Sequence, residues 1–276
     1  MWVGRCGWVR KAGQAKVATV RVLVVRAAGT NCDLETVHAW ELAGARPERL
    51  HVQRLIERPA LLGEFQVLTL PGGFSYGDDI AAGRIFAARL NRHLSDALRA
   101  FVDAERLVLG ICNGFQVLVQ TGLLPWRGRT GPRACTVTHN DPPGFQDRWV
   151  YLHGVSDKCV FVERGAVYEL PIAHGEGRVA LAAPADLAAL QAAGQDVLRY
   201  GGPRRGEPNV HGEPTNPNGS AGDIAGLCDE TGRVLGLMPH PERFVTWTQH
   251  PCWTSLPPRA AGDGLALFRR AVACFK

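Results

Sequence analysis

A cysteine stands where an apolar run gives way to an amphipathic pattern, within residues 107–122 (LVLGICNGFQVLVQTG). Leu107–Ile111 is apolar without polar alternation, which is typical of a strand covered on both faces in a parallel sheet. After Cys112 the apolar residues recur with a helical period. Gly110 and Gly114 flank the cysteine at the spacing of the G-x-S-x-G nucleophile elbow, with sulfur in place of oxygen. We predict a thiolate nucleophile stabilised by a helix N-terminus, with an ordinary buried cysteine as the alternative of equal weight on this pattern alone.

His240 is the one histidine of nine with a distinctive local sequence, LGLMPHPE at residues 235–242. Pro239 and Pro241 favour extended backbone around it, and side chains at i and i+2 of an extended chain point to the same side. Glu242 could then accept the Nδ1 proton and leave Nε2 facing the sulfur. A thiolate nucleophile needs such a proton shuttle and such an orienting group. We therefore predict that His240 and Glu242 complete a triad with Cys112.

The oxyanion that forms when sulfur attacks a carbonyl needs two hydrogen-bond donors. The backbone N–H of Asn113, the residue after the nucleophile, is one donor that the elbow supplies. The second should come from a loop after a neighbouring strand. Val67–Leu70 is predicted as that strand, and the loop Pro71–Asp79 follows it with two adjacent glycines that can turn a peptide N–H into a pocket. By themselves these glycines could equally be ordinary loop residues.

Short apolar runs alternate with helical patterns along the chain. This alternation predicts an α/β fold with a mostly parallel sheet and helices on both faces, and places the catalytic loops beyond the carboxyl ends of the strands. Residues 126–168 give irregular strands and loops that the sequence does not order. The predicted strand and helix pairs are Val22–Val25 with Leu34–Leu42, Val67–Leu70 with Ile85–Val102, and Leu107–Ile111 with Gly114–Thr121, followed by a closing helix from Leu265 to Phe275.

The net charge of +5 is concentrated at the start of the chain, because residues 1–18 hold four basic residues and no acidic one. The rest is nearly neutral, which argues against a phosphate-binding stripe and a nucleic-acid partner. Residues 1–18 lack the apolar segment of a secretory signal and are predicted to be a disordered extension. Residues 19–276 are predicted to form one domain, and no apolar run approaches the length that spans a membrane.

Eight cysteines in 276 residues are too few for a disulfide scaffold. No C-x-x-C pair occurs, so the sequence gives no support for a zinc or redox motif, and we expect no metal in this chain. Reduced cysteines and a cytoplasmic location are the resulting expectations.

The ordered motifs together resemble the class I, triad-type glutamine amidotransferases, which have a flavodoxin-like fold. Within that group they resemble the glutaminase subunits of phosphoribosylformylglycinamidine synthase, over about residues 21–275. Three features depart from the pattern: the residues before Arg21, Ala28 in place of a proline, and an expanded Thr246–Arg259 segment. The motifs that carry the resemblance are GTNCD (29–33), PGGFSYGDD (71–79), GICNGFQ (110–116), PIAHGEG (171–177), NPNGS (216–220) and MPHPER (238–243).

The resemblance implies Cys112 as nucleophile, His240 as base and then acid, and Glu242 as the group that orients the imidazole. It implies that Gly73 and Asn113 supply the oxyanion N–H groups. Further residues are implied to line the glutamine pocket, where Glu176 could bind the α-ammonium group or could equally be a solvated loop carboxylate. These pocket residues are Gly72, Gln116, His174 and Glu176.

The chain has no G-x-x-x-x-G-K-[ST] loop, so it should carry no cofactor. The resemblance implies that ATP and Mg²⁺ are used by a large synthetase subunit, with a small third subunit in many bacteria, and that the acceptor is formylglycinamide ribonucleotide. We expect low activity alone, because a disordered Gly73 loop would lack one oxyanion donor, and activation in the complex. Two alternatives remain: a class I glutaminase of another synthase, and a catalytically silent scaffold.

Overall fold

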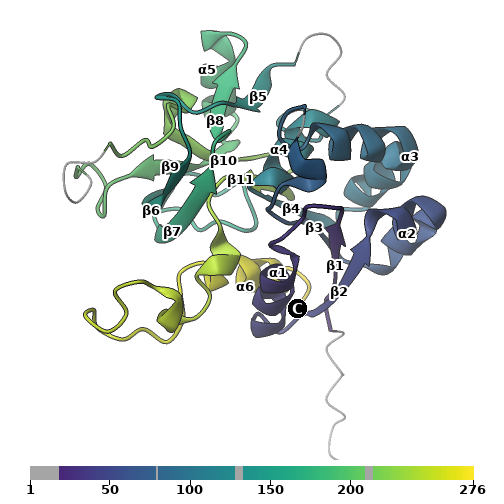
Figure 1. Ribbon diagram of the computed structural model, residues 1–276, viewed down its shortest axis with the longest axis horizontal. Helices are drawn as coiled ribbons and strands as arrows, with labels where there is room; N and C mark the ends of the chain where they lie inside the picture. The colour runs from purple at the N-terminus through teal and green to yellow at the C-terminus, as the bar shows by residue number, and fades with distance from the viewer. Residues whose placement is uncertain (1–18, 79, 128–132, 209–213) are drawn as a thin grey trace, which may run out of the picture.

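The computed structural model describes residues 19–78, 80–127, 133–208 and 214–276, so the prediction for residues 1–18 lies outside the described residues. In this part of the chain a nine-stranded sheet has the order β2-β1-β3-β4-β11-β10-β9-β6-β7, and β5 pairs with β8 in a separate two-stranded sheet (Figure 1). The strands are β1 (Arg21–Arg26), β2 (Arg46–His51), β3 (Val67–Leu70), β4 (Leu107–Ile111), β5 (Cys135–Thr138), β6 (Gln146–Gly154), β7 (Val167–His174), β8 (Arg178–Leu181), β9 (Asp196–Gly201), β10 (Ile224–Cys228) and β11 (Val234–Leu237).

Five strands of the large sheet run parallel, from β2 at the edge through β1, β3 and β4 to β11. Strands β3, β4 and β11 are buried at every position, as their unbroken apolar sequences predict for strands covered on both faces. The predicted strands at 22–25, 67–70 and 107–111 are therefore confirmed. Strands β3, β4 and β11 end directly before the Pro71–Asp79 loop, Cys112 and the His240 segment, respectively.

The other four strands, β10, β9, β6 and β7, continue the sheet with antiparallel pairing. The pairing of β6 with β7 is continuous, from Gln146 opposite His174 to His153 opposite Val167. This half includes β6, which comes from the segment that the sequence could not order, whereas β5 of the same segment lies in the two-stranded sheet. The antiparallel half also brings residues 171–177 to the same edge as the cysteine elbow, where Cys112 Sγ lies 3.9 Å from the carbonyl oxygen of Ala173.

One face of the parallel half is covered by α1 (Asp33–Leu42) and α6 (Leu265–Ala273), which lie together in Figure 1. Trp40 and Phe268 make an edge-to-face contact between the two helices, with ring centroids 4.9 Å apart. The Trp40 indole N–H donates a hydrogen bond of 3.0 Å to the hydroxyl of Thr69 on β3, which satisfies a buried polar pair.

The opposite face is covered by α3 (Arg84–Asp103) and α4 (Asn113–Thr121). Gly110 of β4 and Gly236 of β11 are neighbours in register, and both make room for α4. A Cβ atom on Gly236 would lie 2.1 Å from the ring of Phe115. The glycines therefore let α4 pack directly on the sheet. The remaining helical segments are α2 (Val52–Glu57), α5 (Pro184–Ala192), η1 (Pro59–Glu64), η2 (Ser75–Asp78), η4 (Ala221–Asp223), η5 (Pro241–Arg243) and η6 (Trp247–Gln249).

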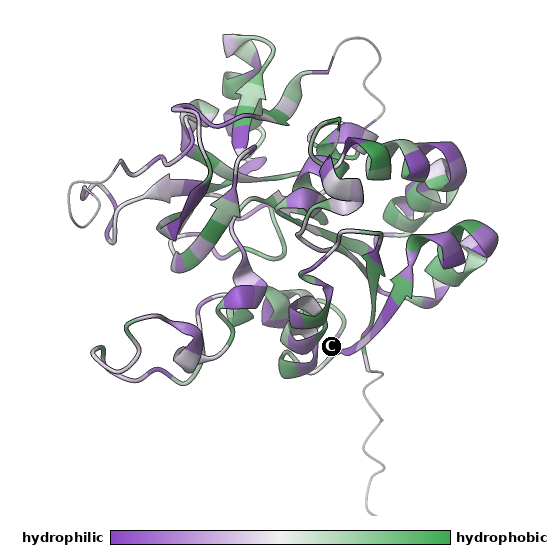
Figure 2. Ribbon diagram, viewed as in Figure 1, coloured by the Kyte–Doolittle hydropathy of each residue, from purple (hydrophilic) through white to green (hydrophobic). Residues whose placement is uncertain are grey.

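Hydropathy follows this layering (Figure 2): the central strands are largely hydrophobic, whereas α3 alternates hydrophobic and hydrophilic residues along its length. The expanded 246–259 segment projects from the sheet in Figure 1 and is anchored at its base by an aromatic group. In that group Trp247 stacks on His250 with centroids 5.5 Å apart, and Phe244 meets Trp149 edge to face. None of the helices in the described ranges is long and apolar enough to cross a membrane.

Candidate active site

Cys112 occupies the sharp turn between β4 and α4, with φ 50° and ψ −106°. This backbone conformation is strained for a residue with a side chain, as expected of a nucleophile elbow. Its N–H donates to the carbonyl of Leu237 at 2.8 Å, which ties the elbow to the end of β11. A Cβ atom on Gly114 would lie 1.9 Å from the carbonyl oxygen of Leu70, so the turn requires glycine there. The elbow predicted from sequence is confirmed in its geometry.

His240 and Glu242 form a close polar contact, with Nδ1 of the imidazole 2.6 Å from Oε1 of the carboxylate. Their relative exposures are 2% and 0%. The expected extended geometry is wrong in detail, because residues 241–243 form the one-turn helix η5. Pro241 begins that turn, a position in which its missing N–H costs nothing, and the turn brings the carboxylate to Nδ1 at the edge of the ring.

The surroundings of His240 favour its protonated form. Burial alone disfavours a charged imidazole, but the neighbouring Glu242 carboxylate and the Cys112 sulfur outweigh burial and raise the pKa of His240 well above its ordinary value. Nε2 makes no hydrogen bond of standard geometry within the described residues. Because Nδ1 is held by Glu242, Nε2 is the nitrogen left to exchange a proton with sulfur and substrate.

The described part of the predicted loop, residues 71–78, is attached to the elbow through the Asn113 side chain. The Ser75 hydroxyl donates to Asn113 Oδ1 at 2.7 Å, and Asn113 Nδ2 donates to Asp78 Oδ1 at 3.1 Å. Gly73 has a φ of 132°, a conformation that L-residues rarely adopt. The loop is therefore built against the nucleophile by side-chain bonds that the sequence pattern did not show.

A cavity of about 390 Å³ opens beside the elbow and is lined by most of the predicted site residues. Gly72, Asn113 and Glu242 do not line it. Gly72 instead lies against the His240 ring, since a Cβ atom there would be 2.7 Å from the imidazole Cε1. The predicted residues that do line the cavity are Gly73, Cys112, Gln116, His174, Glu176 and His240.

His174 has a tautomer that its neighbours determine. Asn140 Nδ2 donates to the carbonyls of Gly144 and His174, at 2.7 and 2.9 Å, and its Oδ1 accepts from the Gly177 N–H at 2.9 Å. Oδ1 therefore also accepts from His174 Nδ1, 3.2 Å away. Burial, and then the charge of His240, lower the pKa of His174 to about 3. Its Nε2 is a buried acceptor without a partner in the described residues.

Gln116 and Glu176 meet at the cavity wall, where Gln116 Nε2 donates to the Glu176 carbonyl at 2.5 Å. The Glu176 side chain is not fully free, because Oε2 accepts from the Ala82 N–H at 3.3 Å and Oε1 lies 3.9 Å from His139. The carboxylate is partly exposed and still faces the cavity. It can therefore meet a cationic group of a bound molecule.

The comparisons with known proteins agree with this geometry. The CobB/CobQ-like glutamine amidotransferase domain family matches residues 19–275. The phosphoribosylformylglycinamidine synthase subunit PurQ of Dehalococcoides mccartyi is 42% identical over 93% of this chain and 98% of its own length, and that of Methanococcus maripaludis is 37% identical over 92% and 97%. The chain belongs to the PurQ family of glutamine amidotransferase domains.

Solved structures support the same family. A chain in the PurLQS structure from Thermotoga maritima superposes with a TM-score of 0.69 and 29% identity, over 94% of this chain and 100% of that one. A glutamine amidotransferase from the same organism has a TM-score of 0.53 at 17% identity, which shows the fold alone. The predicted fold class and family resemblance are both confirmed.

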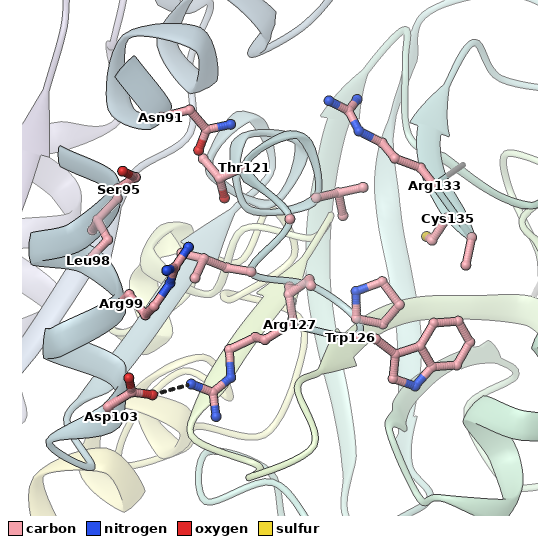
Figure 3. A pocket seen from close by; sticks show the side chains of 16 residues that line it. Asn91, Ser95, Leu98, Arg99, Asp103, Thr121, Trp126, Arg127, Arg133 and Cys135 are labelled. Atoms are coloured by element: carbon pink, nitrogen blue, oxygen red, sulfur yellow. Dashed lines mark hydrogen bonds and ion pairs between the residues drawn. The ribbon is translucent and has the colours of Figure 1, made fainter. Parts of the chain in front are cut away.

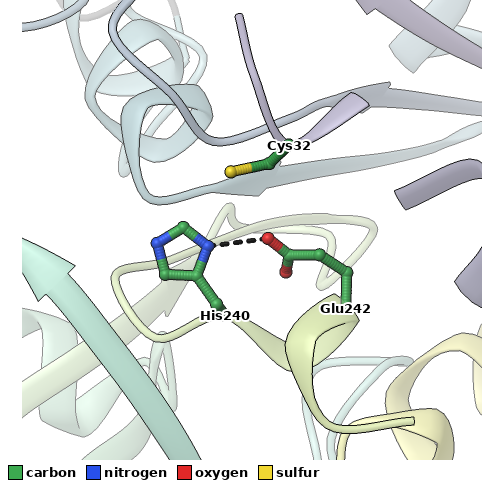
Figure 4. A group of neighbouring side chains, drawn as sticks. All are labelled: Cys32, His240 and Glu242. Carbon is green, nitrogen blue, oxygen red and sulfur yellow. Dashed lines mark hydrogen bonds and ion pairs between the residues drawn. The ribbon is translucent and has the colours of Figure 1, made fainter. Parts of the chain in front are cut away.

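Sequence reasoning assigned no role to two residues beside the triad of this PurQ-family chain. Cys32 Sγ, a nitrogen of His240 and an oxygen of Glu242 all lie within 4.8 Å of one another (Figure 4). Arg243 Nη2 donates to Cys32 Sγ at 3.2 Å. Thiol, imidazole and carboxylate are metal-ligand types, but a proton already joins the imidazole to the carboxylate and a guanidinium cation already faces the sulfur. The arrangement suits proton transfer better than metal binding.

A second hollow of about 430 Å³ lies between α3 and the end of α4 (Figure 3). It contains none of the predicted site residues. Arg127 lines it and pairs with Asp103 at 3.0 Å and with the buried Asp229 at 3.3 Å. Its described lining therefore lacks Cys112 and His240, the candidate nucleophile and proton shuttle that line the smaller cavity.

Proposed function

We propose that this chain is the glutaminase subunit of a phosphoribosylformylglycinamidine synthase. It hydrolyses glutamine and passes the ammonia to a synthetase subunit, which uses ATP to convert formylglycinamide ribonucleotide to formylglycinamidine ribonucleotide in purine biosynthesis. The supporting observation is the buried His240–Glu242 pair beside the strained Cys112 elbow, in a chain 42% identical to a PurQ subunit.

In the proposed first half-reaction, the Cys112 thiolate attacks the side-chain amide carbon of glutamine. The negative charge moves to the amide oxygen, which accepts hydrogen bonds from the N–H groups of Gly73 and Asn113. His240 is held protonated by Glu242 and gives its Nε2 proton to the departing nitrogen. The carbon–nitrogen bond then breaks, leaving ammonia and a γ-glutamyl thioester.

In the second half-reaction, the neutral His240 takes a proton from water as the water oxygen attacks the thioester carbon. The carbon–sulfur bond breaks, glutamate leaves and the imidazolium–thiolate pair is restored. Glu242 keeps Nδ1 protonated throughout, so Nε2 is always the nitrogen that exchanges protons. One glutamine and one water give one glutamate and one ammonia.

The cavity walls recognise the amino acid in this proposal. His174 Nε2 can only accept a hydrogen bond, since Nδ1 donates to Asn140, and it pairs with an N–H of glutamine. Glu176 binds the α-ammonium group, while Gln116 holds the Glu176 backbone in place. Gly72 gives the loop the clearance that it needs beside His240.

The partners follow from the proposed reaction. A large synthetase subunit, with a small third subunit, forms the complex, and ATP and Mg²⁺ belong to the synthetase. Seven described cysteines are free thiols, which supports the proposed cytoplasmic location. We expect the isolated chain to be slow and the complex to be fast, because docking would fix the Gly73 loop in its oxyanion-binding position.

The test is to mix the chain with a PurQ-family synthetase partner and measure glutamine-dependent amidine formation. Wild type should support the reaction, and Cys112→Ala should support it only when ammonium salt replaces glutamine. A chain that hydrolyses glutamine as fast alone as in the complex would contradict the activation. A glutamine-analogue electrophile that leaves Cys112 unlabelled in the complex would indicate a silent scaffold.

A further inference from the structure

The GTNCD motif at residues 29–33 contributes no residue to the proposed triad, yet it contacts two parts of the catalytic site. The motif forms the connection between β1 and α1. Cys32 is 1% exposed, and its carbonyl accepts hydrogen bonds from the N–H and hydroxyl of Thr36, at 3.1 and 2.6 Å. The position of Cys32 is thus determined by the first turn of a helix that packs on the central sheet.

The first contact is with the loop that carries Gly72 and Gly73. The Cys32 N–H donates to the Gly72 carbonyl at 3.3 Å, and the Phe74 N–H donates to the Gly29 carbonyl at 3.0 Å. Gly73 has no room for a side chain, since a Cβ atom there would lie 2.6 Å from the backbone nitrogen of Asn31. Residues 29–32 therefore form the surface against which the loop is shaped.

The second contact is with the proton-transfer pair. The Cys32 sulfur lies within 4.8 Å of the nearest ligand atoms of both His240 and Glu242, and Figure 4 shows it pointing toward the imidazole. A Cβ atom on Gly72 would lie 3.2 Å from this sulfur and 2.7 Å from the ring. The thiol, the ring and the glycine peptide are thus mutually packed.

Cys32 also contacts Arg243, which lies next to Glu242 in the chain. Arg243 donates to the Cys32 sulfur through Nη2 at 3.2 Å and to Glu35 of α1 through Nε at 2.9 Å. Burial, which outweighs the effect of His240, raises the pKa of Cys32 to about 11, so the sulfur is a neutral thiol. Cys32 is therefore suited to separate the Arg243 cation from Glu242 and unsuited to act as a second nucleophile.

We propose that Cys32 is a positioning residue, whose thiol fixes the His240–Glu242 pair relative to the Gly72–Gly73 loop. The inference rests on the proposed function for the identity of the reaction, but its geometric basis is independent of the substrate. The titratable groups that act on the His240 imidazole are Glu242, Cys112, Cys32 and His174, and Arg243 is the cation that contacts the Cys32 sulfur. Removing the thiol lets Arg243 approach Glu242, which weakens the hold of that carboxylate on the imidazolium.

The experiment compares Cys32→Ala and Cys32→Ser with the matched control Cys135→Ala, in the complex with the synthetase. Cys135 is also a buried neutral thiol, on β5, outside the triad cavity. We expect Cys32→Ala to lower kcat about 10-fold or more with little change in KM, because a small displacement of a catalytic group is costly. Cys32→Ser should recover part of this loss, and Cys135→Ala should leave kcat unchanged.

A second readout needs no turnover: the pH dependence of Cys112 alkylation by iodoacetamide, followed peptide by peptide. The alkylation rate should change at the pH where His240 loses its proton. This transition should move to lower pH in Cys32→Ala and should stay in place in Cys135→Ala. An unchanged transition in Cys32→Ala, or equal changes in both variants, would overturn the inference. Wild type could fail to hydrolyse glutamine while Cys32→Ala still moves the alkylation transition to lower pH. That result would contradict the proposed function and support the positioning role of Cys32.

Discussion

The two halves of the central sheet contribute different parts of the site. The parallel half, β2-β1-β3-β4-β11, ends in the Cys112 elbow, the Gly73 loop and the His240 segment. The antiparallel half, β10-β9-β6-β7, contributes the wall that carries His174 and Glu176. The proposed reactive groups thus lie at the carboxyl ends of parallel strands, as expected in α/β folds, whereas His174 and Glu176, the proposed recognition groups, come from the added strands. Changes in the first half should affect the rate and its pH profile, and changes in the second should affect substrate binding and the pH dependence of stability.

The largest expected effect is at the nucleophile in the parallel half. Cys112→Ala should lower glutamine hydrolysis by about 10⁵-fold or more, because the covalent step is lost. The measurement is glutamate release by the complex, with ammonia-dependent synthesis as a check that the complex still assembles. If the variant retained a tenth of the wild-type rate of glutamine hydrolysis, Cys112 would not be the nucleophile.

Glu242→Gln should lower kcat/KM by about 10³-fold, because the orienting carboxylate is lost. Glu242 raises the pKa of His240, so the high-pH limb of the rate profile should also move to lower pH. Glu169→Gln is the matched control, since Glu169 pairs with His250 at 3.3 Å outside the cavity. If kcat/KM falls by the same factor in both variants, the His240–Glu242 pair has no special role in catalysis.

Gly114→Ala tests the junction between helix and sheet. The added Cβ would meet the Leu70 carbonyl oxygen at 1.9 Å, so the free energy of unfolding should fall by about 3 kcal/mol. Gly63→Ala is the control, because no atom lies within 4 Å of its added Cβ. Urea unfolding measures both, and equal stabilities would mean that α4 can shift on the sheet without cost.

The smallest expected effect belongs to the antiparallel half and concerns pH. The pKa of His174 is about 3 in the folded chain against 6.5 when unperturbed, so the unfolded chain binds the proton first as pH falls. Protonation of His174 in the unfolded chain should lower the free energy of unfolding of wild type by about 2 kcal/mol at pH 5 relative to pH 7.5. The His174→Asn variant should lack this decrease. Urea unfolding at both pH values gives the difference, and parallel pH dependences in the two proteins would contradict the burial of a neutral imidazole.

Sequence reasoning was most successful where a function depends on local backbone chemistry. The elbow at Cys112 and the pairing of Glu242 with His240 were both predicted, because steric clearance and short spacing can be read from adjacent residues. The backbone between His240 and Glu242 was predicted wrongly, since it forms a one-turn helix. It was less successful for residues 126–168, where antiparallel β6 pairs with both β7 and β9. Register between strands depends on side chains that meet only after folding, so one sequence does not order them.

The amino-acid sequence by itself determined the candidate reactive groups, the glycine-containing turns that hold them and the alternation that makes the parallel sheet. Only the tertiary structure decided which distant groups support them. Asn140 sets the tautomer of His174 from 34 residues away, and Arg243 reaches Cys32 across 211 residues. The physical reason is that bond geometry and steric clearance act between neighbours in the chain. Burial, charge and hydrogen-bond partners are acquired when remote segments pack together.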